Sequence, residues 1–388
     1  MAGVLIAIIA GLAWGVLGLS LIGSAYMVAA AMTLRAFLSP GTAARRHEDA
    51  VTILKPLHGA EPRLADNLAS FLAQDHGGPI QLLCGVQRSD DSAIAAVETL
   101  RARFPQARID LIVDPTPHGA NGKIANLINL EPHIAHGTLV LSDSDIVVGP
   151  DYLSGLLAAL DAPATGAVTL PYNGRGDAGF WSRVAAAGLS WQFLPGVVFG
   201  AARGLARPCM GSTIAMRRAT LAAIGGFAAF ADVLADDYAM GEAIAAQGLK
   251  VAMPAMLVTH ASTERSFGEL WRHELRWGAT VRGVVPAAYA TSVIAMPLPL
   301  ALLATPAHPL AGLALAGLAL LARLVAAVVA DQRGGTRTAS LWLLPLRDCL
   351  TFAVFVASLA VRSVDWRGAT LKMVERGRIL AEPELPFR

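Results

Sequence analysis

The sequence predicts an α/β domain with a mostly parallel sheet, joined to a membrane by apolar segments on both sides. From about Ala50 to Ser262, short runs rich in β-forming residues alternate with segments whose apolar residues recur at helical spacing. On either side lie apolar stretches long enough to cross a bilayer. Hydrophobic residues make up 54% of the 388-residue chain and charged residues only 15%, which is too apolar for an ordinary soluble protein.

The N-terminal stretch predicts a transmembrane anchor over residues 1–34. It contains no Asp, Glu, Lys, Arg or His, and it exceeds the roughly 20 apolar residues that a spanning helix needs. A secretory signal peptide would start with positive charge and have a shorter apolar core. Arg35, Arg45 and Arg46 follow, so we expect the next domain on the cytoplasmic side.

Net charge and cysteine spacing argue against several classes of protein. The formal net charge of +2 argues against a polyanion-binding protein, so no nucleic-acid partner is expected. Cys84, Cys209 and Cys349 lie far apart without paired spacing. They are predicted to be buried thiols of a reducing compartment, and neither a disulfide frame nor a zinc site.

Residues 48–265 are expected to form the α/β domain. Between the first two β-rich runs, Leu64, Leu68 and Phe71 have the spacing of a crossover helix. Ligands of such sheets bind at the carboxyl ends of the strands, so polar residues directly after a strand are the first candidates for a site. The expected strands are Val51–Leu57, Ile80–Val86, Ile109–Val113, Thr138–Leu141 and Ala167–Pro171.

One polar group directly follows the strand that ends at Leu141. Asp143 and Asp145 are carboxylates one residue apart, which can share a Mg²⁺ or Mn²⁺ ion because these cations prefer hard oxygen ligands and phosphate. The cation would neutralise a nucleotide diphosphate as it departs. An Asp-x-Asp pair also occurs as ordinary turn or cap residues, so the motif alone leaves both interpretations open.

Two further acidic pairs lie in the same region. Asp90 and Asp91 follow the strand that ends at Val86, where a carboxylate could accept hydrogen bonds from a nucleotide base or cap a helix. Asp236 and Asp237 begin an amphipathic helix, and capping explains only one of the two. We take this pair as the candidate catalytic group, with Asp237 as the general base for an acceptor hydroxyl.

The segment 118–123 combines two glycines, a helix start and Lys123, a combination that suits a phosphate group. It is not a Walker loop, because the spacing and the final Ser or Thr are absent. A glycine-rich turn with a solvated lysine explains the segment equally well.

Residues 266–282 predict an interfacial helix that contributes to an acceptor site. Helical spacing places His273, Arg276 and Trp277 on one side. Arginine can pair with a diphosphate in fork geometry, and tryptophan offers a flat surface for a sugar or an apolar acceptor. The alternative is a basic, aromatic helix that holds lipid headgroups.

The C-terminal part contains two more apolar blocks. Residues 283–330 predict a transmembrane hairpin, with a turn near Pro306 and with Arg323 reaching toward the headgroups from the second arm. Residues 341–361 are interrupted by Arg347 and Asp348, and spanning would export the basic tail. We therefore expect an interfacial or re-entrant segment over 341–361 and a cytoplasmic tail over 362–388.

In this order, the segments resemble the ceramide glucosyltransferase-like family of inverting glycosyltransferases. The resemblance is close over about Val51–Arg282 and extends loosely to the tail. His273 is a departure, because the family usually has Gln or Arg at this position. The matching segments are Lys55–Gly59, Gly85–Gln87 before Asp90–Asp91, Gly119–Leu127, Ser142–Asp145, Gly225–Phe227, Ala235–Tyr238 and Arg276–Trp277.

This resemblance implies a GT-A type nucleotide-sugar-binding domain and a UDP-sugar donor with a divalent cation, Mg²⁺ or Mn²⁺. It also implies a lipid acceptor at the membrane. The implied nucleotide-sugar ligands are Asp90 or Asp91 for uridine, and Lys123, Asp143 and Arg276 for the diphosphate. The implied metal ligands are Asp143 and Asp145. Asp237, beside Asp236, is the implied base, and His273 and Trp277 line the implied acceptor site.

Within the family, the sequence of these motifs is most similar to that of the bacterial hopanoid-biosynthesis glycosyltransferases. The similar segments are His118–Asn121, Leu205–Cys209, Leu234–Ala239 and Trp271–Trp277. This similarity implies transfer of N-acetylglucosamine from UDP to bacteriohopanetetrol at the bacterial inner membrane. A ceramide glucosyltransferase that uses UDP-glucose would look similar. The other rivals are a processive polysaccharide synthase, a dolichyl-phosphate-type sugar transferase, and a non-catalytic membrane scaffold or transporter.

Overall fold

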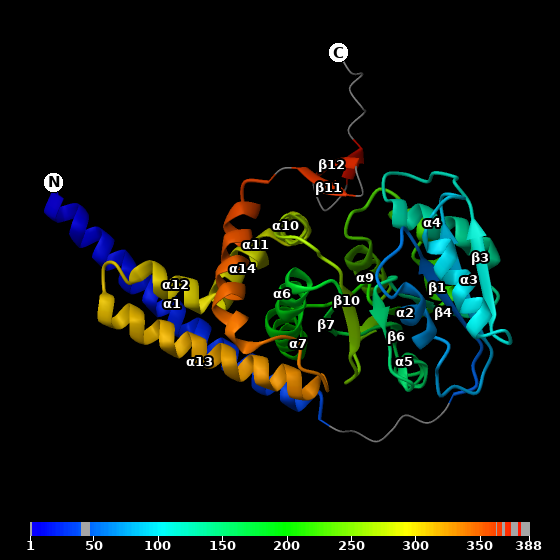
Figure 1. Cartoon of the computed structure of the whole chain (residues 1–388), viewed down its shortest axis with the longest axis horizontal. Helices are drawn as coiled ribbons and strands as arrows, with labels where there is room; N and C mark the ends of the chain where they lie inside the picture. Colours follow the sequence, from blue (N-terminus) through cyan, green and yellow to red (C-terminus); the bar gives the residue numbers. More distant parts are fainter. Residues whose placement is uncertain (1, 40–46, 362, 367–368, 374–378, 382–388) are drawn as a thin grey trace, which may run out of the picture.

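The computed structural model describes residues 2–39, 47–361, 363–366, 369–373 and 379–381. An α/β domain lies at one end of the molecule and an arm of apolar helices at the other, with further helices between them (Figure 1). Arg45 and Arg46, together with much of the expected tail, lie outside the described residues.

The sheet of the α/β domain has seven strands in the order β3-β2-β1-β4-β8-β6-β9. Strand β8 runs antiparallel to both of its neighbours, whereas the other paired strands of this sheet are parallel. The expected α/β class with a mostly parallel sheet is therefore confirmed. The strands are β1 (Val51–Pro56), β2 (Ile80–Val86), β3 (Arg108–Val113), β4 (Thr138–Leu141), β6 (Thr165–Thr169), β8 (Ile214–Arg217) and β9 (Lys250–Ala252).

Helices cover both faces of this sheet, because side chains of a strand alternate between the two faces. Ile53 of β1 packs with α2, α3 and α5, whereas Leu54 packs with α4, α8 and α9 on the other face. The carboxyl ends of β1 and β4 remain as the edge where a ligand can enter. The helices are α2 (Leu64–Ser70), α3 (Ala93–Arg103), α4 (Gly122–Leu130), α5 (Tyr152–Leu160), α8 (Arg218–Ala223) and α9 (Asp236–Ala246).

A second sheet, in the order β5-β10-β7, brings β10 beside the loop that follows β4. Strand β10 pairs antiparallel with β5 and parallel with β7. The backbone amide of Ala261 donates to the carbonyl of Asp145 at 2.7 Å, which fixes β10 against the acidic loop. The strands are β5 (Ile146–Val147), β7 (Tyr172–Gly176) and β10 (Val258–Ser262), and a third sheet contains β11 (Ser363–Trp366), β12 (Ala369–Met373) and β13 (Ile379–Ala381).

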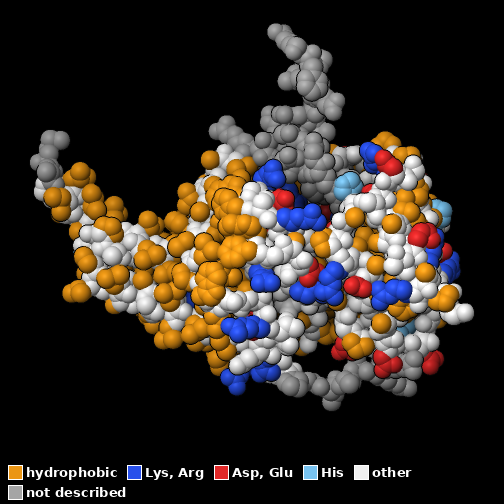
Figure 2. All heavy atoms as spheres, in the orientation of Figure 1, with side chains coloured by type: hydrophobic (Ala, Val, Ile, Leu, Met, Phe, Trp, Pro, Cys, Tyr) orange, Lys and Arg blue, Asp and Glu red, His pale blue; other side chains and the backbone are white. Residues whose placement is uncertain are grey.

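The apolar arm consists of α1 (Ala2–Phe37), α12 (Pro297–Ala304) and α13 (Pro309–Arg333). Gly23 lets α1 approach closely, since a Cβ there would lie 2.2 Å from the Ile294 carbonyl oxygen. Hydrophobic side chains cover the outside of this arm, and Lys and Arg side chains gather between it and the α/β domain (Figure 2). An apolar surface of this kind is typical of membrane proteins.

Within the described part of the chain, four helical segments are long and apolar enough to cross a membrane, by length and composition: 3–37, 180–202, 309–333 and 341–358. The N-terminal and second hairpin segments agree with the prediction. The segment Phe180–Ala202 was not predicted; it contains α6 (Phe180–Gly188), a π-helical turn and α7 (Leu194–Ala202). The segment Leu341–Ser358, which contains α14 (Leu344–Ser358), is also long enough to span, whereas we expected an interfacial or re-entrant element.

The first arm of the expected hairpin is not one straight helix. Helix α10 (Phe267–Val284) ends before α11 (Pro286–Thr291), and the axis then bends by 70° between Pro286–Ala295 and α12. Prolines at 286 and 297 start the two halves, because proline lacks the amide that would continue the preceding helix. Residues of α10 and α11, which precede this bend, line the cavity described next.

Candidate active site

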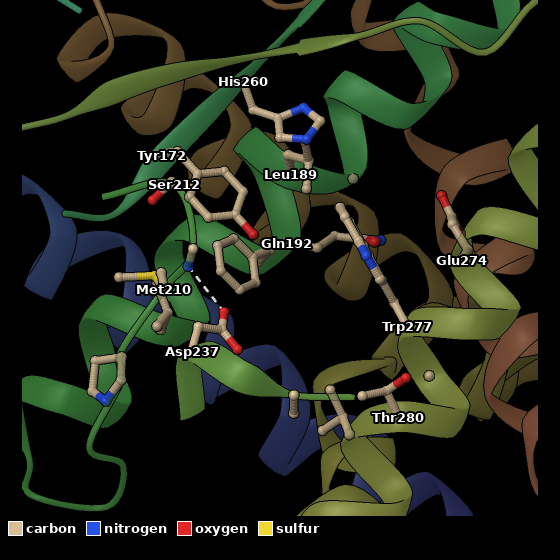
Figure 3. Close-up of a pocket in the computed structure, with 18 of the residues that line it drawn as sticks. Tyr172, Leu189, Gln192, Met210, Ser212, Asp237, His260, Glu274, Trp277 and Thr280 are labelled. Carbon is tan, nitrogen blue, oxygen red and sulfur yellow. Dashed lines mark hydrogen bonds between the residues drawn. The ribbon is translucent and has the colours of Figure 1, made fainter. Parts of the chain in front are cut away.

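A cavity of about 1100 Å³ extends from the carboxyl edge of the sheet to the apolar helices. Its polar part is lined by the loop after β4, the start of α9 and one side of α10. Its apolar part is lined by residues that include Met27 of α1, Val284 of α10, Ala288 of α11 and Phe355 of α14. Aromatic side chains lie between these two parts, with Asp237 facing them (Figure 3). Polar and apolar groups can therefore bind in one space.

Three of the expected site residues converge around Gly211. A Cβ on Gly211 would lie 2.9 Å from Asp143 Oδ2, 3.0 Å from Lys123 Nζ and 3.5 Å from Asp237 Oδ2. Lys123 Nζ pairs with Asp143 Oδ1 at 2.7 Å and with Asp236 Oδ2 at 3.4 Å. The side chain of Asp143 is 37% exposed because it faces the cavity. This cluster presents both a cation and carboxylates to a ligand.

The Asp237 carboxylate is oriented by two backbone amides. Gly211 donates to Oδ2 at 2.9 Å, the contact drawn as a dashed line in Figure 3, and Tyr238 donates to Oδ1 at 2.8 Å. Burial and the neighbouring Asp236 raise the pKa of Asp237 to about 6. Asp237 can therefore be ionised near neutral pH and still accept a proton readily.

Charges near Lys123 keep it protonated. Burial alone would lower the pKa of Lys123, but Asp143, Asp236 and Asp237 outweigh this effect and raise it. Burial also raises the pKa of Asp143, although Lys123 opposes the shift. Lys123 thus supplies a fixed positive charge at the carboxyl edge of the sheet.

Segment 118–123 differs in one respect from a phosphate cradle. The Asn121 side chain accepts hydrogen bonds from the amides of Lys123 and Ile124, at 3.0 and 3.1 Å, so it caps α4 itself. The same side chain donates to the Val233 carbonyl at 2.7 Å, which fastens the segment to the region before Asp236. The contribution of this segment to the cavity is therefore the Lys123 ammonium group.

Asp145 pairs with a histidine of β10. His260 Nε2 lies 3.1 Å from Asp145 Oδ2. Burial opposes protonation of His260, yet Asp145 raises its pKa to about 9. His260 in turn lowers the pKa of Asp145 against the effect of burial. The second carboxylate of the Asp-x-Asp motif is therefore ionised.

The two carboxylates of this motif fit a divalent cation. Asp145 Oδ1 is buried and has no hydrogen-bond partner among the described residues, and Asp143 faces the cavity. Oxygen ligands of this kind suit Mg²⁺ or Mn²⁺. A different acidic group, His47, Asp49 and Asp161, also has ligand spacing. Arg217 pairs with both of its carboxylates, at 3.3 and 2.6 Å, and it lies near the opposite end of β1.

A fully buried lysine holds the acidic loop in place. Lys55 of β1 donates to Ser142 Oγ at 3.0 Å and to the Asp143 carbonyl at 2.7 Å, and it lies 3.4 Å from the centre of the Phe71 ring. Burial lowers the pKa of Lys55 to about 7, although Asp143 and Asp145 oppose this shift. Lys55 is a positioning residue for the backbone that carries Asp143.

Helix α10 places His273, Arg276 and Trp277 at the cavity, as its spacing predicts. His273 Nδ1 lies 2.5 Å from Glu264 Oε1, and its ring meets the Trp277 ring edge-on at 4.3 Å between centroids. The His260 ring lies 6.1 Å from the same tryptophan. His273 is therefore held by a buried glutamate at the edge of the cavity.

The first acidic pair lies elsewhere. Asp90 is exposed and pairs with Arg88 at 2.6 Å, outside the set of residues that line the cavity. Asp91 is buried and accepts hydrogen bonds from the amides of Gly59 and Ala93, both at 2.9 Å. It caps α3 and fastens the loop after β1, so its position agrees with the capping interpretation.

A buried charge network connects α10 to the apolar helices. Glu274 pairs with Arg347 of α14, and Arg347 Nε donates to Gln192 Oε1 at 3.2 Å. Gln192 donates to Asp348 at 2.7 Å, and Asp348 pairs with Arg323 of α13 at 2.8 Å. Arg323 is only 2% exposed. The expectation that Arg323 snorkels to the headgroups is therefore wrong, because Asp348 neutralises it inside the protein.

Sequence reasoning missed four residues that shape this cavity: Lys55, Gly211, His260 and Glu264. Two of them carried a usable signal. Glu264 and His273 lie nine residues apart around the start of α10, and a buried acid beside a histidine is a common pair. Lys55 is a charged residue inside an apolar strand, which predicts a buried partner. Gly211 and His260 lie in segments whose position depends on the tertiary fold.

Fold and cavity together define a membrane-associated α/β protein with an acidic site at the strand ends. The chain belongs to glycosyl transferase family 21, whose sequence profile matches residues 15–379. The domain and its apolar helices agree with the GT-A type expected from the sequence.

Two curated relatives from Caenorhabditis elegans match the chain. Ceramide glucosyltransferase 1 is 24% identical over 225 residues, which are 56% of this chain and 47% of the relative. Ceramide glucosyltransferase 3 is 26% identical over 241 residues, 58% of this chain and 49% of the relative. The chain thus spans about half the length of these relatives.

Among solved structures, a mannosyltransferase from Pyrobaculum calidifontis, in complex with GDP-Man and Mn²⁺, aligns with a TM-score of 0.49 and 18% identity. The alignment covers 89% of this chain and 99% of that one.

Proposed function

We propose that this protein is an inverting glycosyltransferase that moves a sugar from a UDP-sugar to a hydroxyl group of a membrane lipid. The observation that carries the proposal is the single cavity shared by the acidic cluster and the apolar helices. A polar donor can bind in the polar part of this cavity while an apolar acceptor binds in the apolar part. Family membership and the two named relatives support the same class of reaction.

In the proposed reaction, the acceptor oxygen attacks the anomeric carbon while the bond to the diphosphate breaks, so the anomeric centre inverts. Asp237 takes the acceptor proton, which its orientation and pKa of about 6 allow. Lys123 and Arg276 bind the diphosphate from two sides of the cavity. A divalent cation held by Asp143 and Asp145 would neutralise the leaving group.

We assign uridine binding to the loop that Asp91 fastens. Pro56 and Glu61, on either side of that loop, line the cavity, and Ser144 Oγ donates to Glu61 Oε1 at 2.8 Å. Asp91 would act by holding the backbone of this loop through Gly59. Asp90, at the surface with Arg88, has no part in this assignment.

For the sugar and the lipid, two candidates follow from different observations. The sequence motifs that begin at His118, Leu205 and Trp271 favour N-acetylglucosamine as the sugar and bacteriohopanetetrol as the acceptor. The names of the two relatives favour glucose and ceramide. Both acceptors offer a hydroxyl group attached to a large apolar body, which is what the cavity requires.

Mass spectrometry of lipids from cells with and without the gene tests this function. Loss of a sugar-bearing hopanoid identifies the first candidate, and loss of a glycosylceramide identifies the second. Purified protein should also release UDP from a UDP-sugar when lipid acceptor is added. Unchanged lipids together with no UDP release would contradict the proposal and favour a non-catalytic membrane protein.

We further propose that the α/β domain faces the cytoplasm of a bacterial inner membrane. Arg35 at the end of α1 and the basic residues of α10 lie beside the apolar helices, as the positive-inside tendency requires. Cys84 and Cys209 are buried as expected, but Cys349 is exposed, so the prediction of three buried thiols is wrong at that position. In a Cys349→Ser background, a Thr99→Cys variant places a thiol on exposed α3. An impermeant maleimide should label this variant only after the membrane is opened, and labelling of intact cells would contradict the orientation.

A further inference from the structure

Strand β10 and the loop after it present a strip of polar side chains to the cavity. His260, Ser262 and Glu264, spaced two residues apart, all line the cavity and are only 8%, 1% and 6% exposed. Within the described part of the chain, His260 Nδ1, Ser262 Oγ and Glu264 Oε2 have no hydrogen-bond partner. Buried polar atoms are nearly always paired in native proteins, so three such atoms on one wall indicate that a ligand completes them.

The position of this strip follows from its other contacts. His260 Nε2 contacts Asp145, which belongs to the proposed diphosphate end of the cavity. Glu264 Oε1 contacts His273, which lies beside Trp277 on the proposed acceptor helix. The strip therefore lies between the diphosphate end and the acceptor end, where a transferred sugar and an incoming hydroxyl group must meet.

The chemistry of the strip suits neutral hydroxyl groups. The Glu264 carboxylate accepts a hydrogen bond from a hydroxyl, whereas it would repel a phosphate. Ser262 Oγ and His260 Nδ1 can complement the same groups, because a hydroxyl both donates and accepts. The flat ring of Trp277, 6.1 Å from His260 between centroids, offers the apolar surface on which sugar rings pack.

We propose that His260, Ser262 and Glu264 form a subsite that binds hydroxyl groups of a saccharide or polyol. The inference rests on the proposed function and goes beyond it, because none of these residues belongs to the acidic sites or to the arginine–tryptophan motif. The hydroxyl groups can belong to the sugar of the donor or to the head of the acceptor. The experiment below separates these two sources.

The most informative variants are Ser262→Ala and Glu264→Gln, because neither side chain forms a hydrogen bond with the Asp-x-Asp motif among the described residues. Ser262 Oγ has no partner to lose among the described residues, so Ser262→Ala should leave the melting temperature unchanged or raise it. We expect it to weaken binding of the hydroxyl-bearing substrate by about 3- to 10-fold. Glu264→Gln should weaken it by about 10- to 100-fold, since the acceptor of the hydrogen bond is no longer charged.

The measurements are the dissociation constants of UDP, UDP-glucose and UDP-N-acetylglucosamine, and the KM of the lipid acceptor. Weaker binding of the UDP-sugar with unchanged binding of UDP assigns the subsite to the transferred sugar. A raised acceptor KM with unchanged donor binding assigns it to the acceptor head. Glu269→Gln is the matched control, because Glu269 lies five residues after Glu264, at the start of α10, where it is exposed and outside the cavity lining.

One result would refute the subsite alone, and another would refute the proposed function. If wild-type protein transfers sugar, and both variants bind donor and acceptor as the wild type does, the subsite is refuted and the proposed function stands. If wild-type protein neither binds a UDP-sugar nor modifies lipid, the proposed function fails and the subsite fails with it.

Discussion

At the scale of single residues, Asp237 combines a fixed orientation with an altered acidity. Its two carboxylate oxygens accept hydrogen bonds from the amides of Gly211 and Tyr238, so the group cannot rotate freely. Burial beside Asp236 raises its pKa to about 6. A base with this acidity stays ionised at neutral pH and loses its function when protonated.

Two results are expected from this base. Asp237→Asn should lower kcat by about 10²- to 10⁴-fold while a UDP-sugar still binds, because the amide cannot take the acceptor proton. In the wild type, kcat should fall as the pH drops through about 6, since protonation removes the base. Initial rates on either side of that pH, with donor binding measured in parallel, test both points. Turnover retained by Asp237→Asn would exclude Asp237 as the base.

Gly211 tests the convergence of the charged groups. A methyl group there would lie 2.9 Å from Asp143 Oδ2 and 3.0 Å from Lys123 Nζ, so both side chains must move. We expect Gly211→Ala to lower kcat/KM by about 100-fold, the effect of displacing reacting groups by about 1 Å. Gly137→Ala is the control, because Gly137 precedes β4 and has open space around its Cα. Equal activity in both variants would show that the cluster is not catalytic.

At the scale of elements, the strands that form distinct apolar runs could be predicted, and a strand inside a turn-rich segment could not. The β-rich runs placed β1, β2, β3 and β4 within one residue of their observed bounds. Strand β8 was missed, because its four residues continue a turn-rich segment and only its two neighbours define it. The Asp-x-Asp motif could be predicted because Asp143 lies just after β4, a strand that its apolar run reveals.

Other parts of the site depend on contacts between distant segments, so local sequence does not reveal them. His260 and Glu264 reach the cavity because β10 pairs with β5 and β7. Arg323 was misjudged because its partner Asp348 lies 25 residues away on another helix. A charge inside an apolar helix predicts a partner, but its identity requires the packing.

The charge network between α10, α13 and α14 gives an element-scale prediction. Arg323→Met leaves Asp348 buried without its cation, which should destabilise the protein by about 3–5 kcal/mol. The double variant Arg323→Met/Asp348→Leu removes both charges and should recover most of that loss. Thermal unfolding in detergent measures the two variants. A double variant no more stable than the single one would contradict a paired role for these residues.

At the scale of the whole molecule, one cavity joins two environments. The α/β domain supplies the charged groups, and the apolar helices supply Val284, Ala288 and Phe355 to the same cavity. Exposed hydrophobic side chains on the outside of the arm keep this second part in lipid (Figure 2). A donor from water and an acceptor from the membrane can thus reach Asp237 from opposite ends.

Blocking the apolar end alone tests this arrangement most directly. Ala288→Trp should fill the acceptor end, whereas Ala290→Trp, on the same short helix but outside the cavity lining, should not. The measurement is transfer of labelled sugar to lipid by purified protein in nanodiscs, with UDP binding as the control for the donor end. We predict that Ala288→Trp binds UDP normally and loses lipid glycosylation, while Ala290→Trp keeps both. Full glycosylation by Ala288→Trp, or equal loss in the two variants, would contradict the shared cavity.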